Sequence, residues 1–285
     1  MLDENQKRAV EELIREVGDQ CIFSYFRNLS KEDISFKESE NDPVSIADRE
    51  AEKLLRDGLT RILPDSRFVG EESYAEDAGI LKLLDQQDQP VWVVDPIDGT
   101  ANFVAGREGF GIIICLVMGG ETLSSWLYEV CSKAMTVLHK GQEIVTNAGE
   151  ISAAASARPY KGQIGLRLFQ FSEVQAMTGQ VSDLLIQQAA DPSIINYQRM
   201  LTGALDFVVY KVTYPWDHLA GVALVIKNGG IASRWSGQDF LVSDVYEGLV
   251  VARNREVYDL VMSEVVKPLS GSEEIMGLKV LKGKA

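Results

Sequence analysis

The stretch WVVDPIDGTANF, Trp92–Phe103, holds the residues on which the fold and the chemistry of this chain depend. A short apolar run ends at Asp95, and a second carboxylate, Asp98, stands directly before Gly99 and Thr100. The apolar run predicts a buried β-strand. Carboxylates at the end of such a strand project from a rigid base, so we expect both acids of this D-x-x-D turn to face one space.

Two carboxylates at short range repel each other, and one of them is driven to protonate unless a cation lies between them. The surroundings offer oxygen ligands without nitrogen or sulfur, a set that suits Mg²⁺. Gly99 and Thr100 would bring the backbone close to an anion, and a helix that began there would hold a phosphate. A divalent cation beside a phosphate indicates metal-assisted phosphoryl hydrolysis. Taken alone, the stretch is equally compatible with an ordinary Pro-Asp-Gly turn.

Three other stretches carry acids in comparable places. RFVGEES puts Glu71 and Glu72 directly after a short predicted strand, where they could join the same cluster or lie in a solvated loop. YPWDHLAG puts Asp217 at the start of an apolar helix, where an N-cap role would explain it. DPVSIADREAE puts Asp48 three residues after Ser45, the spacing of a capping box. Taken singly, the last two stretches favour the structural interpretation.

The composition describes an acidic globular protein. The 285 residues carry a net charge of −14, and 46% of them are apolar. Such a chain can bury a core without disulfides. The negative charge argues against binding to a nucleic-acid backbone, but a bound cation can reverse the local sign for a small phosphorylated molecule. The three cysteines are scattered, which suits a reducing compartment. No apolar run approaches the roughly 20 residues that span a bilayer, so we expect a cytoplasmic protein without membrane contact.

Apolar periodicity predicts an alternation of helices and strands. Helices are expected at 5–28, 44–64, 171–190, 217–230 and near the C-terminus. Strands are expected at 67–70, 91–95, 110–130 (a hairpin), 134–141, 205–212 and 248–254. The alternation favours a layered α/β fold. A stretch of small residues near 151 suggests two halves, 1–150 with most of the acids and 151–285 with Asp217.

Taken together and in this order, DPVSIADREAE, FVGEES, WVVDPIDGTANF and PWDHLAG…NGG resemble the inositol monophosphatase family. The resemblance extends over residues 37–230. It implies an α/β (α+β) fold, the layered αβαβα sandwich of these sugar phosphatases. It also implies a lithium-sensitive phosphomonoesterase that uses two or three Mg²⁺ ions per site and forms a homodimer.

The substrate implied by the resemblance is a small phosphorylated alcohol similar to inositol 1-phosphate. Relatives in the family use histidinol phosphate, 3′-phosphoadenosine 5′-phosphate or sugar phosphates, and these remain alternatives. Two further alternatives are a regulatory protein that uses its surface and a phosphatase that has lost its activity.

The resemblance also assigns roles to individual positions. It implies that the metal ligands are Glu71, Asp95, the carbonyl of Ile97, Asp98 and Asp217. It implies that the residues that orient the attacking water are Glu71, Thr100 and Asp48. The residues that it implies bind phosphate or substrate are Asp98, Gly99, Thr100 and Asp217, and from this sequence itself we expect Arg199 and Tyr210 to bind substrate as well.

Some positions depart from the family pattern. Tyr210 stands where inositol-selective members carry an acid, and the segment before that strand looks short. Arg199 is the local candidate for selecting a ligand by charge. Lys37 falls where the family usually has a basic residue near a mobile loop. We expect His218 to lie near the site without ligating a metal.

Overall fold

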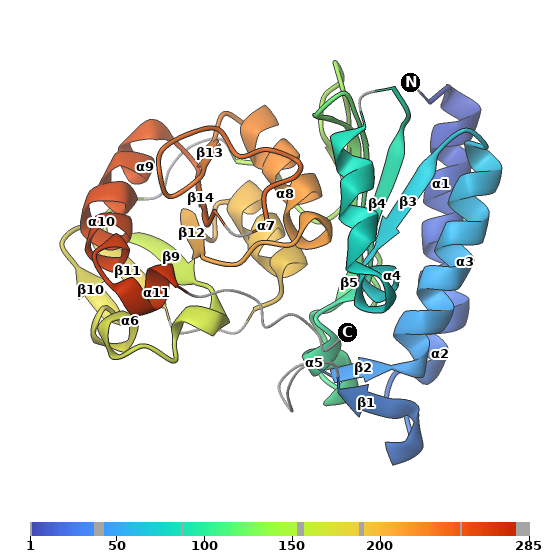
Figure 1. Ribbon diagram of the computed structural model, residues 1–285, viewed down its shortest axis with the longest axis horizontal. Helices are drawn as coiled ribbons and strands as arrows, with labels where there is room; N and C mark the ends of the chain where they lie inside the picture. The colour runs from blue at the N-terminus through green and yellow to red at the C-terminus, as the bar shows by residue number, and fades with distance from the viewer. Residues whose placement is uncertain are drawn as a thin grey trace.

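The computed structural model describes residues 2–36, 43–86, 88–152, 157–187, 191–245 and 247–277. Layers of helices and sheets alternate along the long axis of the molecule, which is horizontal in Figure 1. An outer pair of helices covers a six-stranded sheet, a second pair separates this sheet from another six-stranded sheet, and further helices close the far side. The αβαβα architecture expected from the sequence is confirmed.

The first layer is made by α1 (Glu4–Glu16) and α3 (Ile46–Ile62). A π-helical segment, Val17–Ile22, continues α1 into α2 (Phe23–Tyr25). Ser45 is the N-cap of α3, and Asp48 completes the predicted capping box. The two-stranded sheet of β1 (Ile34–Phe36) and β2 (Pro43–Ser45) lies beside the start of α3.

The first six-stranded sheet has the order β3-β4-β5-β6-β7-β8. Its strands are β3 (Arg67–Gly70), β4 (Val91–Asp98), β5 (Gly111–Met118), β6 (Glu121–Glu129), β7 (Ala134–His139) and β8 (Val145–Thr146). Between β3 and β4 lie α4 (Glu71–Glu76) and a 3₁₀ segment, Ala78–Asp85. Strands β3 and β4 are parallel, and every other neighbouring pair is antiparallel. The predicted hairpin turns at Gly119 and Gly120, both with positive φ.

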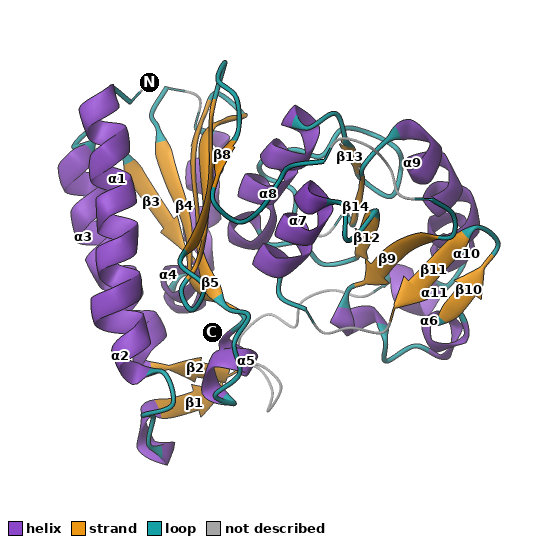
Figure 2. Ribbon diagram, turned by 180° about the vertical axis from the view of Figure 1, so that it is seen from behind, coloured by secondary structure: helices purple, strands orange, loops and turns teal. Residues whose placement is uncertain are grey.

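The second six-stranded sheet has the order β10-β11-β9-β12-β14-β13. Its strands are β9 (Tyr160–Ile164), β10 (Gly179–Val181), β11 (Leu184–Gln187), β12 (Phe207–Tyr210), β13 (Ile231–Ser233) and β14 (Leu249–Ala252). Two helices, α7 (Ser193–Thr202) and α8 (Pro215–Lys227), lie between the two sheets, as Figure 2 shows from behind. The outer layer holds α6 (Ser172–Ala176), α9 (Arg255–Val261), α10 (Lys267–Ser270) and α11 (Glu273–Met276).

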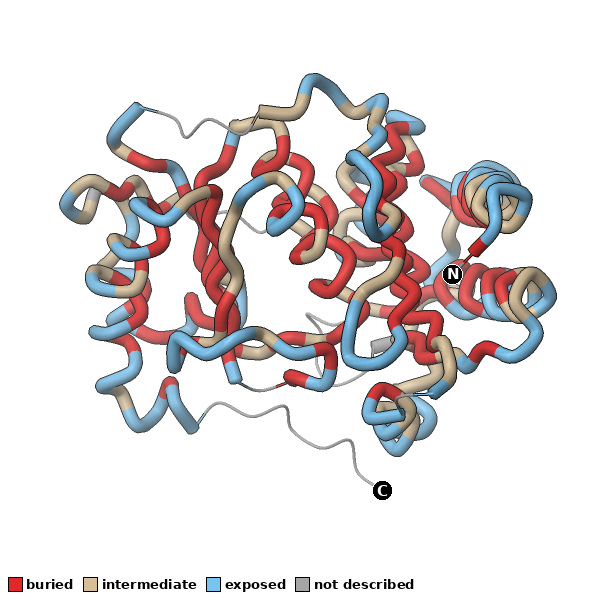
Figure 3. The backbone as a smooth tube through the Cα atoms, turned by 90° about the horizontal axis from the view of Figure 1, so that it is seen from above, coloured by how far each residue is buried: buried red, intermediate tan, exposed pale blue. Residues whose placement is uncertain are grey.

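The layers bury three apolar clusters. The first joins α1 and α3 to one face of the first sheet, the second packs α7 and α8 against its other face, and the third lies beneath α9. Buried residues therefore concentrate in the middle layers, while the outer helices show an exposed side (Figure 3). Within the described residues, no helix combines the length and apolarity that a membrane span requires.

The prediction of one helix over 171–190 is wrong within the described residues. Helix α6 ends at Ala176, and the chain turns into the antiparallel pair β10 and β11. Gly179 has φ +107° and Ser182 has φ +53°, neither of which fits a right-handed helix. The alternating burial of Leu184 and Ile186 is the strand pattern.

The expectation of a short approach to β12 is also wrong. Helix α7 occupies the ten residues Ser193–Thr202 and ends at Gly203, which has φ +84° as a C-terminal cap. Strand β9 was not predicted either, because its polar and small residues carry no apolar alternation and the strand forms by pairing with β11 and β12.

Candidate metal centre and adjoining cavity

Three carboxylates from two elements meet at the end of β4. Asp95 and Asp98 belong to β4, and Asp217 belongs to the first turn of α8. One oxygen from each lies within 4.8 Å of the others. Asp95 and Asp98 are buried, and Asp217 is half-buried. Tyr214 is the N-cap of α8, so the interpretation of Asp217 as an N-cap is wrong.

Backbone geometry explains how one strand offers two acids to one point. The pairing of β4 with β5 shifts register between Asp95 and Asp98, which is the mark of a bulge and re-aims side chains. The Asp95 Oδ1 accepts a hydrogen bond of 3.0 Å from the N–H of Ile97. The Asp98 Oδ2 accepts one of 2.6 Å from the N–H of Ile194, so the start of α7 holds this carboxylate.

The cluster is electrostatically costly without a cation. Burial raises the pKa of Asp98 to about 7, and the charge of Glu71 adds to this rise. Burial, followed by the charges of Asp98 and Glu71, raises the pKa of Asp217 well above its usual range. Glu71, the first residue of α4, is thus close enough to act on both. A divalent cation would reverse these shifts, and an all-oxygen donor set fits Mg²⁺.

A buried carboxylate that we did not predict from the sequence positions Glu71. Glu52 of α3 accepts hydrogen bonds from the N–H groups of Glu72, at 2.7 Å, and Ser73, at 3.0 Å. It thereby anchors the start of α4 to α3. The signal in the sequence is its place four residues after Asp48, on the same face of the helix.

Thr100 joins the acidic cluster to Asp48. Its hydroxyl lies 3.1 Å from the Asp48 Oδ1 and 2.9 Å from the carbonyl oxygen of Ile97. The other oxygen of Asp48 accepts hydrogen bonds from the N–H and hydroxyl of Ser45. Asp48 therefore has its capping-box contacts and a contact with Thr100 at the same time.

Gly99 occupies a position that no other residue fits. Its φ is +92°, and an added Cβ would lie 2.9 Å from the carbonyl oxygen of Gly109 and 2.7 Å from Pro192. Helix α5 (Thr100–Val104) begins at the next residue. The first N–H groups of a helix have no acceptor within it.

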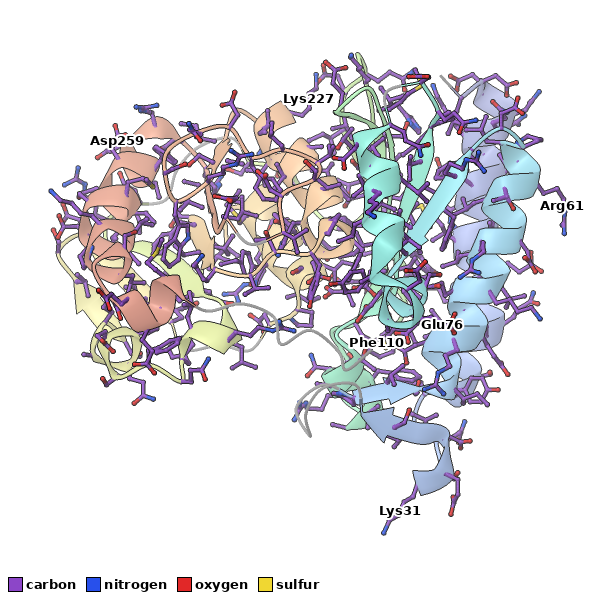
Figure 4. The ribbon with its side chains drawn as sticks, in the orientation of Figure 1. Lys31, Arg61, Glu76, Phe110, Lys227 and Asp259 are labelled. Carbon is purple, nitrogen blue, oxygen red and sulfur yellow. The ribbon has the colours of Figure 1, made fainter. Side chains whose placement is uncertain are left out.

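Aromatic side chains pack beneath the turn formed by Gly99 and Thr100. Phe110, labelled in Figure 4, is fully buried near α5. Its ring meets Phe103 of α5 edge-on at 5.0 Å and Phe26 at 4.9 Å. The turn therefore rests on the first apolar cluster, which makes it a rigid base for the acids.

A cavity of about 230 Å³ adjoins the acidic cluster at Gly99 and Thr100. Tyr210 lines it. Its other polar lining residues include Gln163, Asp191 and Asn196, which we did not predict. They escaped notice because β9 and α7 were not recognised, so nothing in the sequence pointed to these side chains sharing a surface.

The remaining candidates lie in different places. Arg199 does not line the cavity but donates to the Asp191 carboxylate at 2.5 Å. His218 is buried, and its Nδ1 lies 3.1 Å from the Tyr197 hydroxyl. Burial lowers the pKa of His218 to about 3, which keeps its ring neutral. Lys37 falls outside the described residues.

Fold and site together define a layered α/β protein with a cluster of carboxylates beside a small polar cavity. The sequence model of the Inositol monophosphatase family matches residues 3–269, and the chain belongs to this family. The resemblance found in the four motifs is thereby confirmed.

Individual relatives agree with this assignment. The chain is similar to the fructose-1,6-bisphosphatase/inositol-1-monophosphatase of Thermotoga maritima, with 26% identity over 91% of this chain and 96% of the relative. It is also similar to the histidinol-phosphatase of Chlorobaculum parvum, with 26% identity over 85% of this chain and 90% of the relative. The solved structure of inositol monophosphatase II from Staphylococcus aureus covers 97% of this chain and 100% of its own, with a TM-score of 0.77 and 21% identity. Family membership supports a phosphomonoesterase.

Proposed function

We propose that this protein hydrolyses the monophosphate ester of a small alcohol, similar to inositol 1-phosphate, with a water molecule activated by Mg²⁺. The observation that carries the proposal is the convergence of Asp95, Asp98 and Asp217 beside a cavity that begins at Gly99 and Thr100. Acids that disfavour their own ionisation need a cation, and a phosphate needs the donors that the turn offers.

Five groups would coordinate the metal, which we propose to be two or three Mg²⁺ ions. Bound there, Mg²⁺ would lower the pKa of a coordinated water and offset the charge of the phosphate. The proposed ligands are Glu71, Asp95, the carbonyl of Ile97, Asp98 and Asp217. The hydrogen bonds that Asp95 and Asp98 accept from backbone N–H groups fix these side chains before any ligand arrives.

The remaining roles fall to Thr100, Asp48 and Gly99. In the proposed mechanism the Thr100 hydroxyl, held between Asp48 and Ile97, orients the attacking water together with Glu71. The N–H groups of Gly99 and Thr100 donate to phosphate oxygens. No side chain becomes phosphorylated, because water is the nucleophile.

Several finer properties belong to the same proposal. Inhibition by lithium and a homodimer rest on family membership. A cytoplasmic location rests on the scattered cysteines, and a division into halves at about residue 150 rests on the stretch of small residues there. The net charge of the chain, −14, disfavours binding to nucleic acid.

The test is phosphate release from a panel of esters in Mg²⁺ and in EDTA. The panel holds inositol 1-phosphate, histidinol phosphate, 3′-phosphoadenosine 5′-phosphate, fructose 1,6-bisphosphate and glycerol 2-phosphate. We expect release that requires Mg²⁺, falls with lithium and is lost in an Asp95→Asn variant that unfolds at no lower a temperature than the metal-free wild type. Folded, metal-loaded protein that releases phosphate from none of these esters would instead favour a regulatory protein or an inactive phosphatase.

A further inference from the structure

The described part of the cavity wall beyond the phosphate-binding turn carries one formal charge. Among the described residues that line the cavity, Asp191 alone has a charged side chain. The others are uncharged and include Gln163, Asn196 and Tyr210. Burial raises the pKa of the Tyr210 hydroxyl, so this side chain is neutral as well. Whatever the wall recognises therefore depends on the state of Asp191.

Arg199 neutralises Asp191. Its Nη1 donates to the Asp191 Oδ2 at 2.5 Å, and the two side chains are only 30% and 34% exposed. The same oxygen accepts a hydrogen bond of 2.8 Å from the Nε2 of Gln163. The Nη2 of Arg199 donates to Gln187 at 3.3 Å, which keeps the guanidinium in this orientation. The pair is built into the wall by residues of β9, β11 and α7.

A second contact orients the Tyr210 hydroxyl. The Nδ2 of Asn196 donates to the Tyr210 oxygen at 3.0 Å and to the carbonyl oxygen of Asp191 at 3.2 Å. Asn196 is only 2% exposed, so its amide is fixed by its surroundings. This contact holds the phenolic oxygen in place at the cavity wall.

We propose that the Asp191–Arg199 ion pair determines the substrate specificity of this site. Because the pair neutralises the charge of the cavity wall, the site selects a leaving alcohol that is uncharged and carries several hydroxyl groups. The inference rests on the proposed function. Among the described residues that line the cavity, an amino alcohol phosphate would find only the Asp191 carboxylate, which Arg199 already neutralises. A second phosphate would find no guanidinium among these lining residues. Hydroxyl groups, which donate and accept, suit a wall of Gln163, Asp191 and Tyr210.

Charge-unbalancing variants test this directly through ratios of kcat/KM. Arg199→Met leaves the Asp191 carboxylate unbalanced, and we expect the ratio for histidinol phosphate over inositol 1-phosphate to rise roughly fivefold, which corresponds to about 1 kcal/mol. Asp191→Asn leaves Arg199 unbalanced, and we expect the ratio for fructose 1,6-bisphosphate over inositol 1-phosphate to rise similarly. The double variant restores neutrality and should return both ratios to within about twofold of wild type.

Arg199→Lys is the matched control, because it keeps the positive charge and should keep the wild-type ranking. Thermal stabilisation by inositol or histidinol with inorganic phosphate gives the same ranking without turnover. The inference is overturned if both unbalanced variants keep the wild-type ratios, or if wild type prefers histidinol phosphate. Absence of turnover on all esters would overturn the proposed function alone, since the stabilisation ranking still tests the wall.

Discussion

Replacing Asp98 by asparagine should stabilise the metal-free protein. The side chain is 8% exposed, and its pKa rises from 3.8 to about 7 because of burial and Glu71. Ionisation therefore costs more in the folded state than in the unfolded state. Wild type without metal should lose stability as the pH rises from about 4 to about 7. The asparagine side chain of the variant cannot ionise, and its carbonyl oxygen can still accept from the N–H of Ile194.

The pKa shift sets an upper limit on this gain in stability. A rise of about three pKa units corresponds to roughly 4 kcal/mol, at about 1.4 kcal/mol for each unit. Burial and the charge of Asp98 also favour protonation of Asp217, so the two carboxylates share the effect, and we expect a gain of about 1 to 3 kcal/mol in the free energy of unfolding at pH 8.

Urea unfolding in EDTA measures this gain at pH 5 and pH 8, with Asp65→Asn as a control for an exposed acid. The gain at pH 5 should be less than half of the gain at pH 8, and Asp65→Asn should change little at either pH. Mg²⁺ should stabilise wild type more than the Asp98 variant. A variant less stable than wild type at pH 8 in EDTA would show that the Asp98 charge is stabilising, and would refute the reasoning.

Three further changes have expected outcomes. Gly99→Ala should cost at least about 1 kcal/mol more in urea unfolding than Gly120→Ala, because both have positive φ but only the first Cβ meets other atoms; equal costs would contradict this. Arg253→Met should destabilise the protein by about 3 to 5 kcal/mol, because it removes the guanidinium that forms an ion pair with the buried Asp206 carboxylate, and a loss under about 1 kcal/mol would oppose this account. Burial lowers the pKa of His139 to about 4, so the folded protein resists protonation of this side chain. As the pH falls from 6.5 to 4, wild type should therefore lose about 1 kcal/mol of unfolding free energy relative to His139→Asn, measured by thermal unfolding. Parallel stability curves of the two proteins over this pH range would contradict the prediction.

The sequence predicts the half of the site that depends on local signals. Asp95, Asp98, Gly99 and Thr100 lie within one turn, so their proximity follows from chain geometry. Asp217 lies far along the chain, and only the family resemblance linked it to the others. The structure brings its carboxylate within 4.8 Å of theirs.

The cavity wall could not be predicted in the same way. Gln163 lies on a strand of small and polar residues that forms by pairing with β11 and β12. Asp191 and Asn196 lie at the start of a helix whose clearest signal is the cap at Gly203. Interactions between such segments arise from tertiary packing, which local propensity does not encode.

The central claim is that the carboxylates share a cation, and calorimetric titration of Mg²⁺ into metal-free protein tests it most directly. The account predicts saturable binding to wild type that strengthens as the pH rises through about 7, because the pKa of Asp98 lies there. It predicts at least roughly tenfold weaker binding to a folded Asp95→Asn variant. Equal Mg²⁺ affinity for wild type and variant would contradict the account.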